Sequence, residues 1–119
     1  MKLELLHEYG INYQDGLTRC MGDVELYANL LTMFLSDDSF NRALTAYEFN
    51  DFETLFRSLH ELKGASGTAG MTELYEAVCP LVDQLRDYQG DGKELQLPFE
   101  RVDMAYRRAR DGVSLALEQ

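Results

Sequence analysis

The chain has 119 residues, of which 45% are hydrophobic and 27% are charged, and its formal net charge is −10. This length and composition are typical of one soluble globular domain with a single core. Nucleic acid and anionic membrane surfaces attract an excess of Lys and Arg, so the negative charge argues against both kinds of partner. No window of 18 apolar residues occurs, and the sequence therefore predicts no membrane-spanning segment.

The cysteines and the first residues predict a cytoplasmic location. Cys20 and Cys79 lie far apart, and no second Cys or His stands at metal-ligand spacing from either. Reduced thiols of this kind are usual in the cytoplasm. The opening MKLELLHEYG carries acidic residues inside its apolar run and lacks a small-residue cleavage site, which argues against a secretory signal. We expect one monomeric cytoplasmic domain over residues 1–119, without a bound metal or cofactor.

Two short helices are predicted first. Residues 2–9 form the first, which stops at Gly10 in a left-handed conformation. Asn12 is the expected N-cap of the second, over residues 13–20. His7 lies in the first helix, but no cation, glycine or second ligand stands at helical spacing from it. We interpret His7 as a surface histidine without a functional role.

Apolar residues at three-four spacing then predict two longer helices, over residues 24–35 and 40–49. Asp23 is the expected N-cap of the first of these. The turn between them, residues 36–39, also offers capping side chains for the second. Asp51 is the expected cap of the helix that follows.

The last third of the chain predicts two more helices. The first has its apolar stripe over residues 74–88, with Thr72 as its expected cap and an expected end near residues 89–90. It contains Pro80, which should bend or divide it. After a polar loop, Pro98 fits the first turn of the final helix, in which Gly112 is an expected weak point. Since no strand-like alternation appears, we predict an all-α fold: an antiparallel up-down four-helix bundle with additional short N-terminal helices.

The most informative stretch is residues 51–71. His60 falls just off the edge of its apolar stripe, and Lys63 and Gly64 follow three and four positions later, on the same side of the helix. Glycine at position 64 costs about 1 kcal/mol of helix stability relative to Ala. This cost is explained if a partner must approach the backbone closely at that position. From periodicity alone, a boundary histidine hydrogen-bonded at the bundle surface fits equally well. The stripe consists of Phe52, Leu55, Phe56, Leu59 and Leu62.

The run HELKGASGTAG, from His60 to Gly70, resembles the signature of histidine-containing phosphotransfer (HPt) domains. The family pattern is a His, then Lys and Gly at the third and fourth positions after it, then small residues ending in Gly. Upstream, GLTRCMGDVELYANLL at residues 16–31 resembles the opening segment of the same family. Together the two resemblances span most of residues 9–85.

The resemblance implies that His60 accepts and donates a phosphoryl group and that Lys63 stabilises its charge. It also implies that the partner, a receiver domain, supplies the Mg²⁺, the phosphoaspartate and the catalytic groups, so that no metal site is needed in this chain. The residues expected to contact the partner are Arg57, Glu61, Gly64 and Gly67, and those expected to be structural beside the site are Ser66 and Gly70.

No nucleotide-binding loop occurs, so the chain should not phosphorylate itself from ATP. We expect a free-standing phosphocarrier whose partners are response-regulator receiver domains and a hybrid sensor histidine kinase. Two alternatives remain open. One is the substrate domain of a chemotaxis-type histidine kinase, and the other is a helical adaptor that binds a receiver without accepting phosphate.

Overall fold

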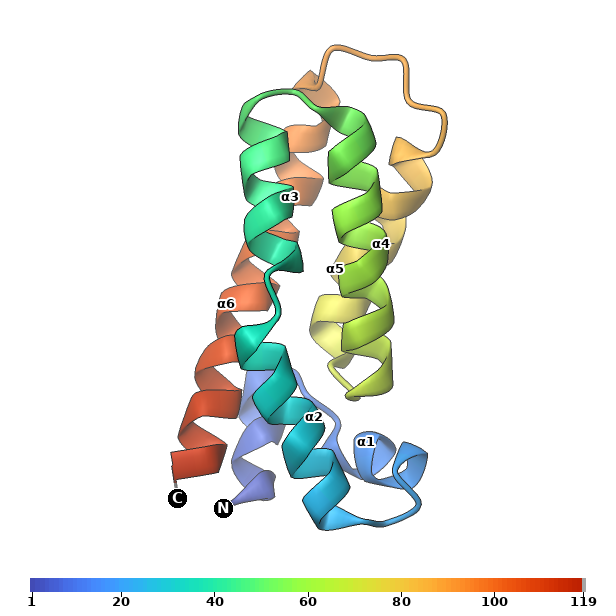
Figure 1. Ribbon diagram of the computed structural model, residues 1–119. Coiled ribbons are helices and arrows are strands. Elements are labelled where there is room, and N and C mark those ends of the chain that lie inside the picture. The colour runs from blue at the N-terminus through green and yellow to red at the C-terminus, as the bar shows by residue number, and fades with distance from the viewer. Residues whose placement is uncertain (119) are drawn as a thin grey trace.

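The computed structural model describes residues 1–118, in which every regular element is a helix (Figure 1). The predicted helices all appear, with most of their ends within one residue of the expected positions. None of the helices in this range is long and apolar enough to cross a membrane. In chain order the elements are the 3-10 helix η1 Leu3–Tyr9, α1 Tyr13–Arg19, α2 Val24–Ser36, α3 Ser39–Glu48, α4 Phe52–Thr68, α5 Thr72–Leu85, the 3-10 helix η2 Lys93–Leu95, and α6 Gln96–Glu118.

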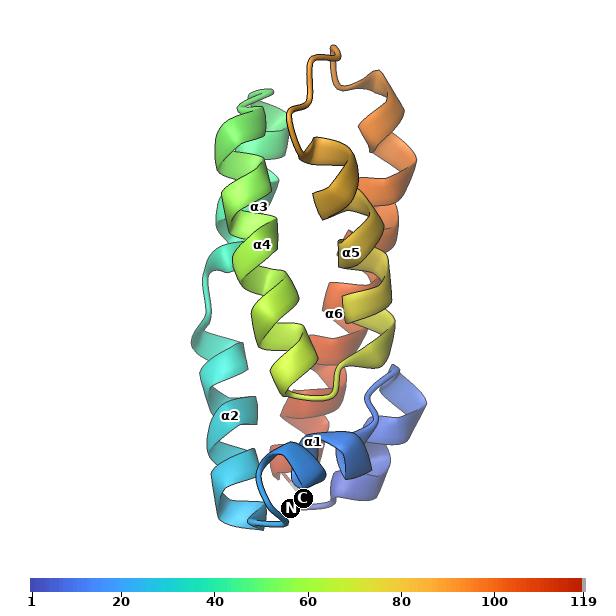
Figure 2. The same cartoon turned by 90° about the vertical axis from the view of Figure 1, so that its right-hand side faces the viewer.

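The long helices form an antiparallel bundle, 44 Å along its longest axis (Figures 1 and 2). Helices α2 and α3 follow one another along one edge, interrupted only at residues 37 and 38, and together form the first rod. Helix α4 returns beside α3, α5 reverses again, and α6 runs the full length of the bundle. Helices η1 and α1 lie at the end of the bundle where α4 turns into α5. The predicted up-down four-helix bundle with short N-terminal helices is therefore confirmed.

The apolar stripes read from the sequence form the core of this bundle. In α4, Leu55, Leu59 and Leu62 are fully buried, which leaves the opposite face of the helix open to solvent. Aromatic rings fill the space between α3 and α6, where Phe40 stacks on Tyr106 with ring centroids 4.1 Å apart. The buried leucines hold α4 against this core and leave its other side exposed.

The predicted caps explain where the helices begin. The side chains of Asn12, Asp23 and Asp51 each accept a hydrogen bond from the backbone N–H three residues later, at the start of α1, α2 and α4. Gly10 ends η1 with a φ of +78°, as expected for a left-handed C-terminal residue. These side-chain and backbone signals are local, and each of them is confirmed.

Thr72 is not the cap of α5, as the sequence had suggested. It is the first residue of the helix, and Met71 occupies the N-cap position. The Thr72 hydroxyl donates instead to the carbonyl oxygen of Gly70. The tight turn from α4 to α5 uses the hydroxyl itself, so it is not available for capping.

The predicted end of α5 near residues 89–90 is also wrong, because the helix stops at Leu85. The backbone becomes extended at Arg86, with a ψ of 118°, and the Tyr88 ring packs edge-on against Phe52. Tyr88 therefore continues the apolar spacing of α5 although it lies beyond the end of the helix. The final helix starts earlier than predicted, at Gln96.

Two local expectations concern α5 and α6. Pro80 does not divide α5, because both Pro80 and Glu76, whose carbonyl loses its donor, lie on the exposed side where water can replace the bond. A bend at Pro80 stays a prediction. Gly112 is not a weak point of α6. A Cβ on it would lie 2.5 Å from the Cβ of Tyr9, so its lack of a side chain lets η1 pack directly against α6.

Candidate functional site

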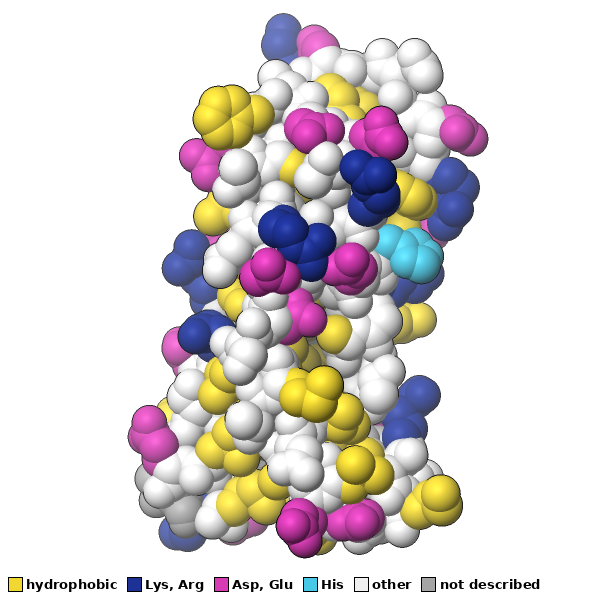
Figure 3. Space-filling model, viewed as in Figure 1, with side chains coloured by type: hydrophobic (Ala, Val, Ile, Leu, Met, Phe, Trp, Pro, Cys, Tyr) yellow, Lys and Arg dark blue, Asp and Glu magenta, His cyan; other side chains and the backbone are white. Residues whose placement is uncertain are grey.

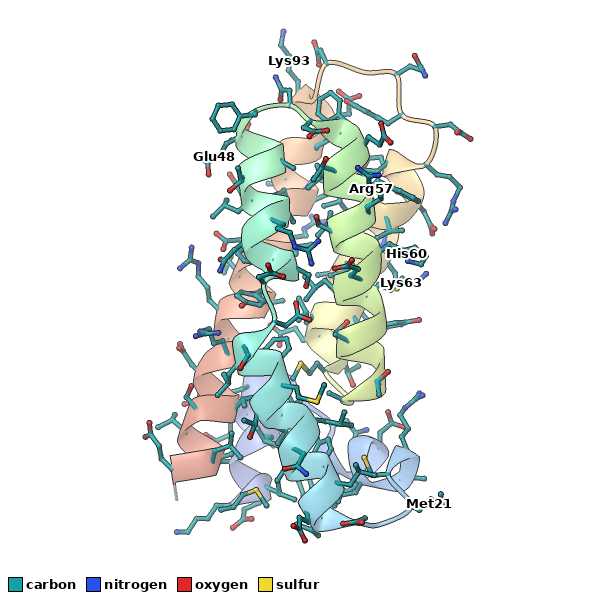
Figure 4. All side chains as sticks on the ribbon, viewed as in Figure 1. Met21, Glu48, Arg57, His60, Lys63 and Lys93 are labelled. Carbon is teal, nitrogen blue, oxygen red and sulfur yellow. The ribbon has the colours of Figure 1, made fainter. Side chains whose placement is uncertain are left out.

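His60 stands on the exposed side of α4 (Figure 4). In the same view, Figure 3 shows a histidine side chain protruding from the surface at that position. Its ring is tilted against Phe56, one turn earlier, with centroids 6.0 Å apart. Among residues 1–118 the imidazole has no hydrogen-bond or ion-pair partner. The alternative of a hydrogen-bonded boundary histidine is therefore not what the structure shows.

Lys63 lies beside His60, one turn further along α4 (Figure 4). Its side chain is half-buried, and no carboxylate in the described part of the chain lies within ion-pair distance of its ammonium group. Most cations of this protein are neutralised by neighbours, as in the Arg57–Glu53 pair. The structure thus places an unpaired positive charge next to an unpaired imidazole.

His60 and Lys63 line a surface groove with a volume of about 640 Å³. The groove lies between the second half of α4, the start of α5, and α1. It brings together most of the residues expected at the site. The expected residues that line it are His60, Lys63, Gly64, Ser66, Gly67 and Gly70.

The three glycines at the groove differ in what surrounds the position of their missing side chain. A Cβ on Gly64 would meet nothing within 4 Å, so no internal contact requires a glycine there. A Cβ on Gly67 would lie 3.0 Å from the Tyr75 ring, and one on Gly70 would lie 2.4 Å from the carbonyl oxygen of Asn12. Gly67 and Gly70 therefore allow close packing within the protein. Gly64 leaves bare backbone facing solvent.

Ser66 is part of the helix framework beneath the groove. It is fully buried, and its hydroxyl donates to the carbonyl oxygen of Lys63 at 3.1 Å. Its own carbonyl accepts the N–H of Met71 at 2.9 Å, which closes the end of α4. The hydroxyl thus bonds back to its own helix, and among residues 1–118 no base lies in hydrogen-bond contact with it.

Two of the expected contact residues lie apart from the groove. Arg57 pairs with Glu53 at 3.6 Å, one turn before His60. Glu61 is ion-paired with Arg42 of α3, so its carboxylate is directed toward the neighbouring helix. Neither Arg57 nor Glu61 lines the groove around His60.

The groove also contains residues that the sequence did not single out. Asp15 and Arg19 of α1 form one side of it, and Tyr75 and Glu76 of α5 form another. Arg19 lies within the segment 16–31 that resembles the family's opening segment, yet nothing in its helical spacing relates it to His60. On the other side of the histidine, the Arg86 guanidinium lies over the Phe56 ring, 5.4 Å from its centroid.

Within residues 1–118, no group of three or more His, Cys, Asp or Glu side chains is arranged to hold a metal ion. Besides the side chains contributed by α1 and α5, the groove offers an imidazole, an ammonium group and exposed backbone, all from α4. An imidazole without a partner can act as a nucleophile near neutral pH, and an ammonium group can neutralise part of the charge of a phosphoryl group.

Comparison with known proteins gives a family. A family model described as "Hpt domain" matches residues 29–112, from α2 into α6, and this match includes the whole of α4 with His60 and Lys63. No curated protein and no solved structure matches the chain. The family match, together with the helical bundle that presents an exposed histidine, shows that this chain belongs to the Hpt domain family, the histidine phosphocarriers of phosphorelays.

Proposed function

We propose that His60 is the phosphoryl acceptor and donor of this chain. It takes a phosphoryl group from the phosphoaspartate of one receiver domain and passes it to the aspartate of another. The observation that carries this proposal is the unpartnered, exposed imidazole beside an unpaired ammonium group on a rigid helix. No other histidine in the described chain has a neighbouring cation of this kind.

On this chain, the group that forms the new bond is a ring nitrogen with a free lone pair. The nitrogen attacks phosphorus as the phosphorus–oxygen bond to the receiver's aspartate breaks, and the carboxylate leaves with that electron pair. The second transfer reverses these bonds with a different carboxylate. The ring is exposed and touches Phe56 on one side only, so that a partner can reach it from solvent. A bound receiver would supply the metal ion that neutralises the phosphoryl oxygens.

Lys63 and Gly64 assist the transfer and the approach of the receiver, respectively. The Lys63 ammonium stabilises the negative charge on the phosphoryl oxygens during transfer and on the phosphohistidine afterwards. Gly64 leaves room for the receiver's backbone, because any side chain there would project into open solvent beside His60. Lys63 can take its role because no carboxylate is paired with it. Gly64 can take its role because it has no side chain.

His7 is a poor acceptor by comparison. It is exposed on η1, and no Lys or Arg lines the hollow beside it, whereas Lys63 and Arg19 line the groove at His60. No cation in that hollow would therefore neutralise a phosphoryl group on His7. His7 also lies outside residues 29–112, the part of the chain that matches the family.

We place the chain in the cytoplasm as a single monomeric carrier domain. A hybrid sensor histidine kinase would load it through its receiver, and a response regulator would unload it. Its large negative charge keeps it away from nucleic acid and anionic membranes, while the site itself carries the unpaired Lys63.

The test is a labelling reaction with a receiver domain charged by radioactive acetyl phosphate. Wild-type chain should acquire phosphate that is labile in acid and stable in base, and His7→Gln should behave the same. His60→Gln should acquire none while its circular dichroism spectrum and receiver affinity stay unchanged. Undiminished labelling of His60→Gln would reject the proposal. Failure of every receiver to label the wild type, with binding intact, would favour the adaptor alternative.

A further inference from the structure

One wall of the groove comes from a part of the chain that the family match does not include. Asp15 and Arg19 lie on α1, before residue 29 where the match begins. The facing wall carries His60 and Lys63 on α4. A receiver that reaches His60 must therefore approach a surface that α1 shares.

Helix α1 is held firmly in that position. The N–H of Asn12, its N-cap, donates to the carbonyl oxygen of Gly70 at 2.8 Å. Gly70 has a φ of +72° and no Cβ, and the Asn12 carbonyl lies in the space that a Cβ would occupy. On the other side, Gly16 packs on the Tyr27 ring, whose Cε1 would be 2.3 Å from a Cβ at that position. The wall is therefore preformed and needs no folding step upon binding.

Arg19 gives the α1 wall a positive charge that a bound partner can contact. Arg19 pairs with Asp15 at 3.1 Å within α1, and its side chain is 56% exposed. An exposed pair at this spacing contributes little to stability, so Arg19 can exchange Asp15 for a carboxylate of a partner. Lys63 is the other cation in the groove, which also contains the carboxylates of Asp15 and Glu76. Arg19 and Lys63 thus offer two positive charges on a chain whose net charge is −10, and only Arg19 already has a carboxylate partner.

We propose that α1 is part of the receiver-docking surface and that Arg19 selects receivers that present an acidic side chain at the contact beside their phosphorylation site. This inference rests on the proposed function, because it takes the partner of His60 to be a receiver domain. It adds a specificity residue that acts in recognition and takes no part in the transfer chemistry.

The experiment measures association of the unphosphorylated chain with a panel of receiver domains that differ in charge around the phosphorylated aspartate. Arg19→Glu should associate about tenfold more slowly with the acidic receivers at low salt, and this difference should shrink to about twofold at 0.5 M salt. Arg101→Glu is the matched control, since Arg101 is an exposed α6 arginine that does not line the groove. The control should change the rates by less than about twofold.

A second variant moves the effect in the opposite direction. Asp15→Asn removes the internal partner of Arg19 and should speed association with the acidic receivers. The inference is overturned if Arg19→Glu and Arg101→Glu act alike, or if Arg19→Glu weakens all receivers equally. Because the readout is binding, it is independent of labelling at His60. A chain that binds selectively through Arg19 but is never labelled would contradict the proposed function alone.

Discussion

The hydroxyl of Tyr27 in α2 donates a 2.8 Å hydrogen bond to the carbonyl oxygen of Ala69, the residue that ends α4. Tyr27 is fully buried, and its ring also covers Gly16 of α1. One side chain therefore connects α1, α2 and the end of the helix that carries His60. The shape of the groove depends on this connection, because α1 and α4 are two of its three walls.

Tyr27→Phe should lower the free energy of unfolding by about 1 kcal/mol. The substitution keeps the ring over Gly16 but leaves the buried carbonyl of Ala69 without its donor. Urea denaturation followed by circular dichroism measures the change. Tyr75→Phe is the control, since Tyr75 is partly exposed and its hydroxyl has no hydrogen-bond partner among residues 1–118; it should change the stability little. Equal stability of the two variants would contradict the expectation.

The same tyrosine predicts a loss of stability in alkali. Burial raises the pKa of Tyr27 above its ordinary value near 10. The folded state therefore retains the phenolic proton at pH values where the unfolded chain loses it. The contribution to stability is complete below pH 10 and decreases as the pH rises above that value. Denaturation between pH 8 and pH 11 should show the decline, and Tyr27→Phe should make it shallower. Burial also raises the pKa of Tyr47, which accounts for part of the remaining slope.

Replacement by alanine should change the free energy of unfolding in opposite directions at two helical glycines. Gly64→Ala should raise the free energy of unfolding by about 0.5–1 kcal/mol, because its Cβ meets nothing and alanine favours the helix. Gly112→Ala should lower it by about 1–3 kcal/mol, because the new Cβ would collide with Tyr9. Thermal unfolding of both variants shows whether each one gains or loses stability. A loss of stability in Gly64→Ala would mean that the backbone at this position is not free.

Gly64→Leu should then separate stability from function. A leucine side chain would project from α4 into the space beside His60, and it should block a receiver sterically without disturbing the core. We expect normal secondary structure and at least about a tenfold loss of receiver affinity, which corresponds to about 1.4 kcal/mol. Unaltered affinity would show that no partner approaches the backbone at Gly64.

The sequence was sufficient for much of this site because the relevant signals are local. The apolar stripe put His60 at the edge of the buried face, and the structure indeed leaves it exposed. Asp51 marked the start of α4, and the small residues up to Gly70 marked its end. Capping and periodicity involve residues within one or two turns, so they can be read without knowledge of the fold. The role of His60 as acceptor stays a prediction.

What the sequence missed depends on contacts between distant segments. Arg19 lies at the groove because α1 is anchored by distant contacts, among them the hydrogen bond from Asn12 to Gly70, 58 positions further along the chain. The ion pair between Glu61 and Arg42 of the neighbouring helix had no signal in the sequence either, and a contact of Glu61 with a partner stays a prediction. Tyr88 kept the apolar spacing of α5 although the helix had already ended. Such differences arise when a tertiary contact overrides a local pattern.

Lys63→Ala should slow phosphoryl transfer to His60 by about tenfold or more while leaving receiver binding nearly unchanged. The ammonium group has no carboxylate to release, so its full charge acts on the phosphoryl group as negative charge develops on the oxygens. Lys63→Arg keeps the charge and should recover part of the rate. Single-turnover transfer from a charged receiver gives the rate, and titration of the same variant gives the affinity. Lys93→Ala, which removes an exposed lysine paired with Asp91, is the control and should transfer normally. If Lys63→Ala lowers only the affinity, Lys63 acts in docking and not in the transfer step.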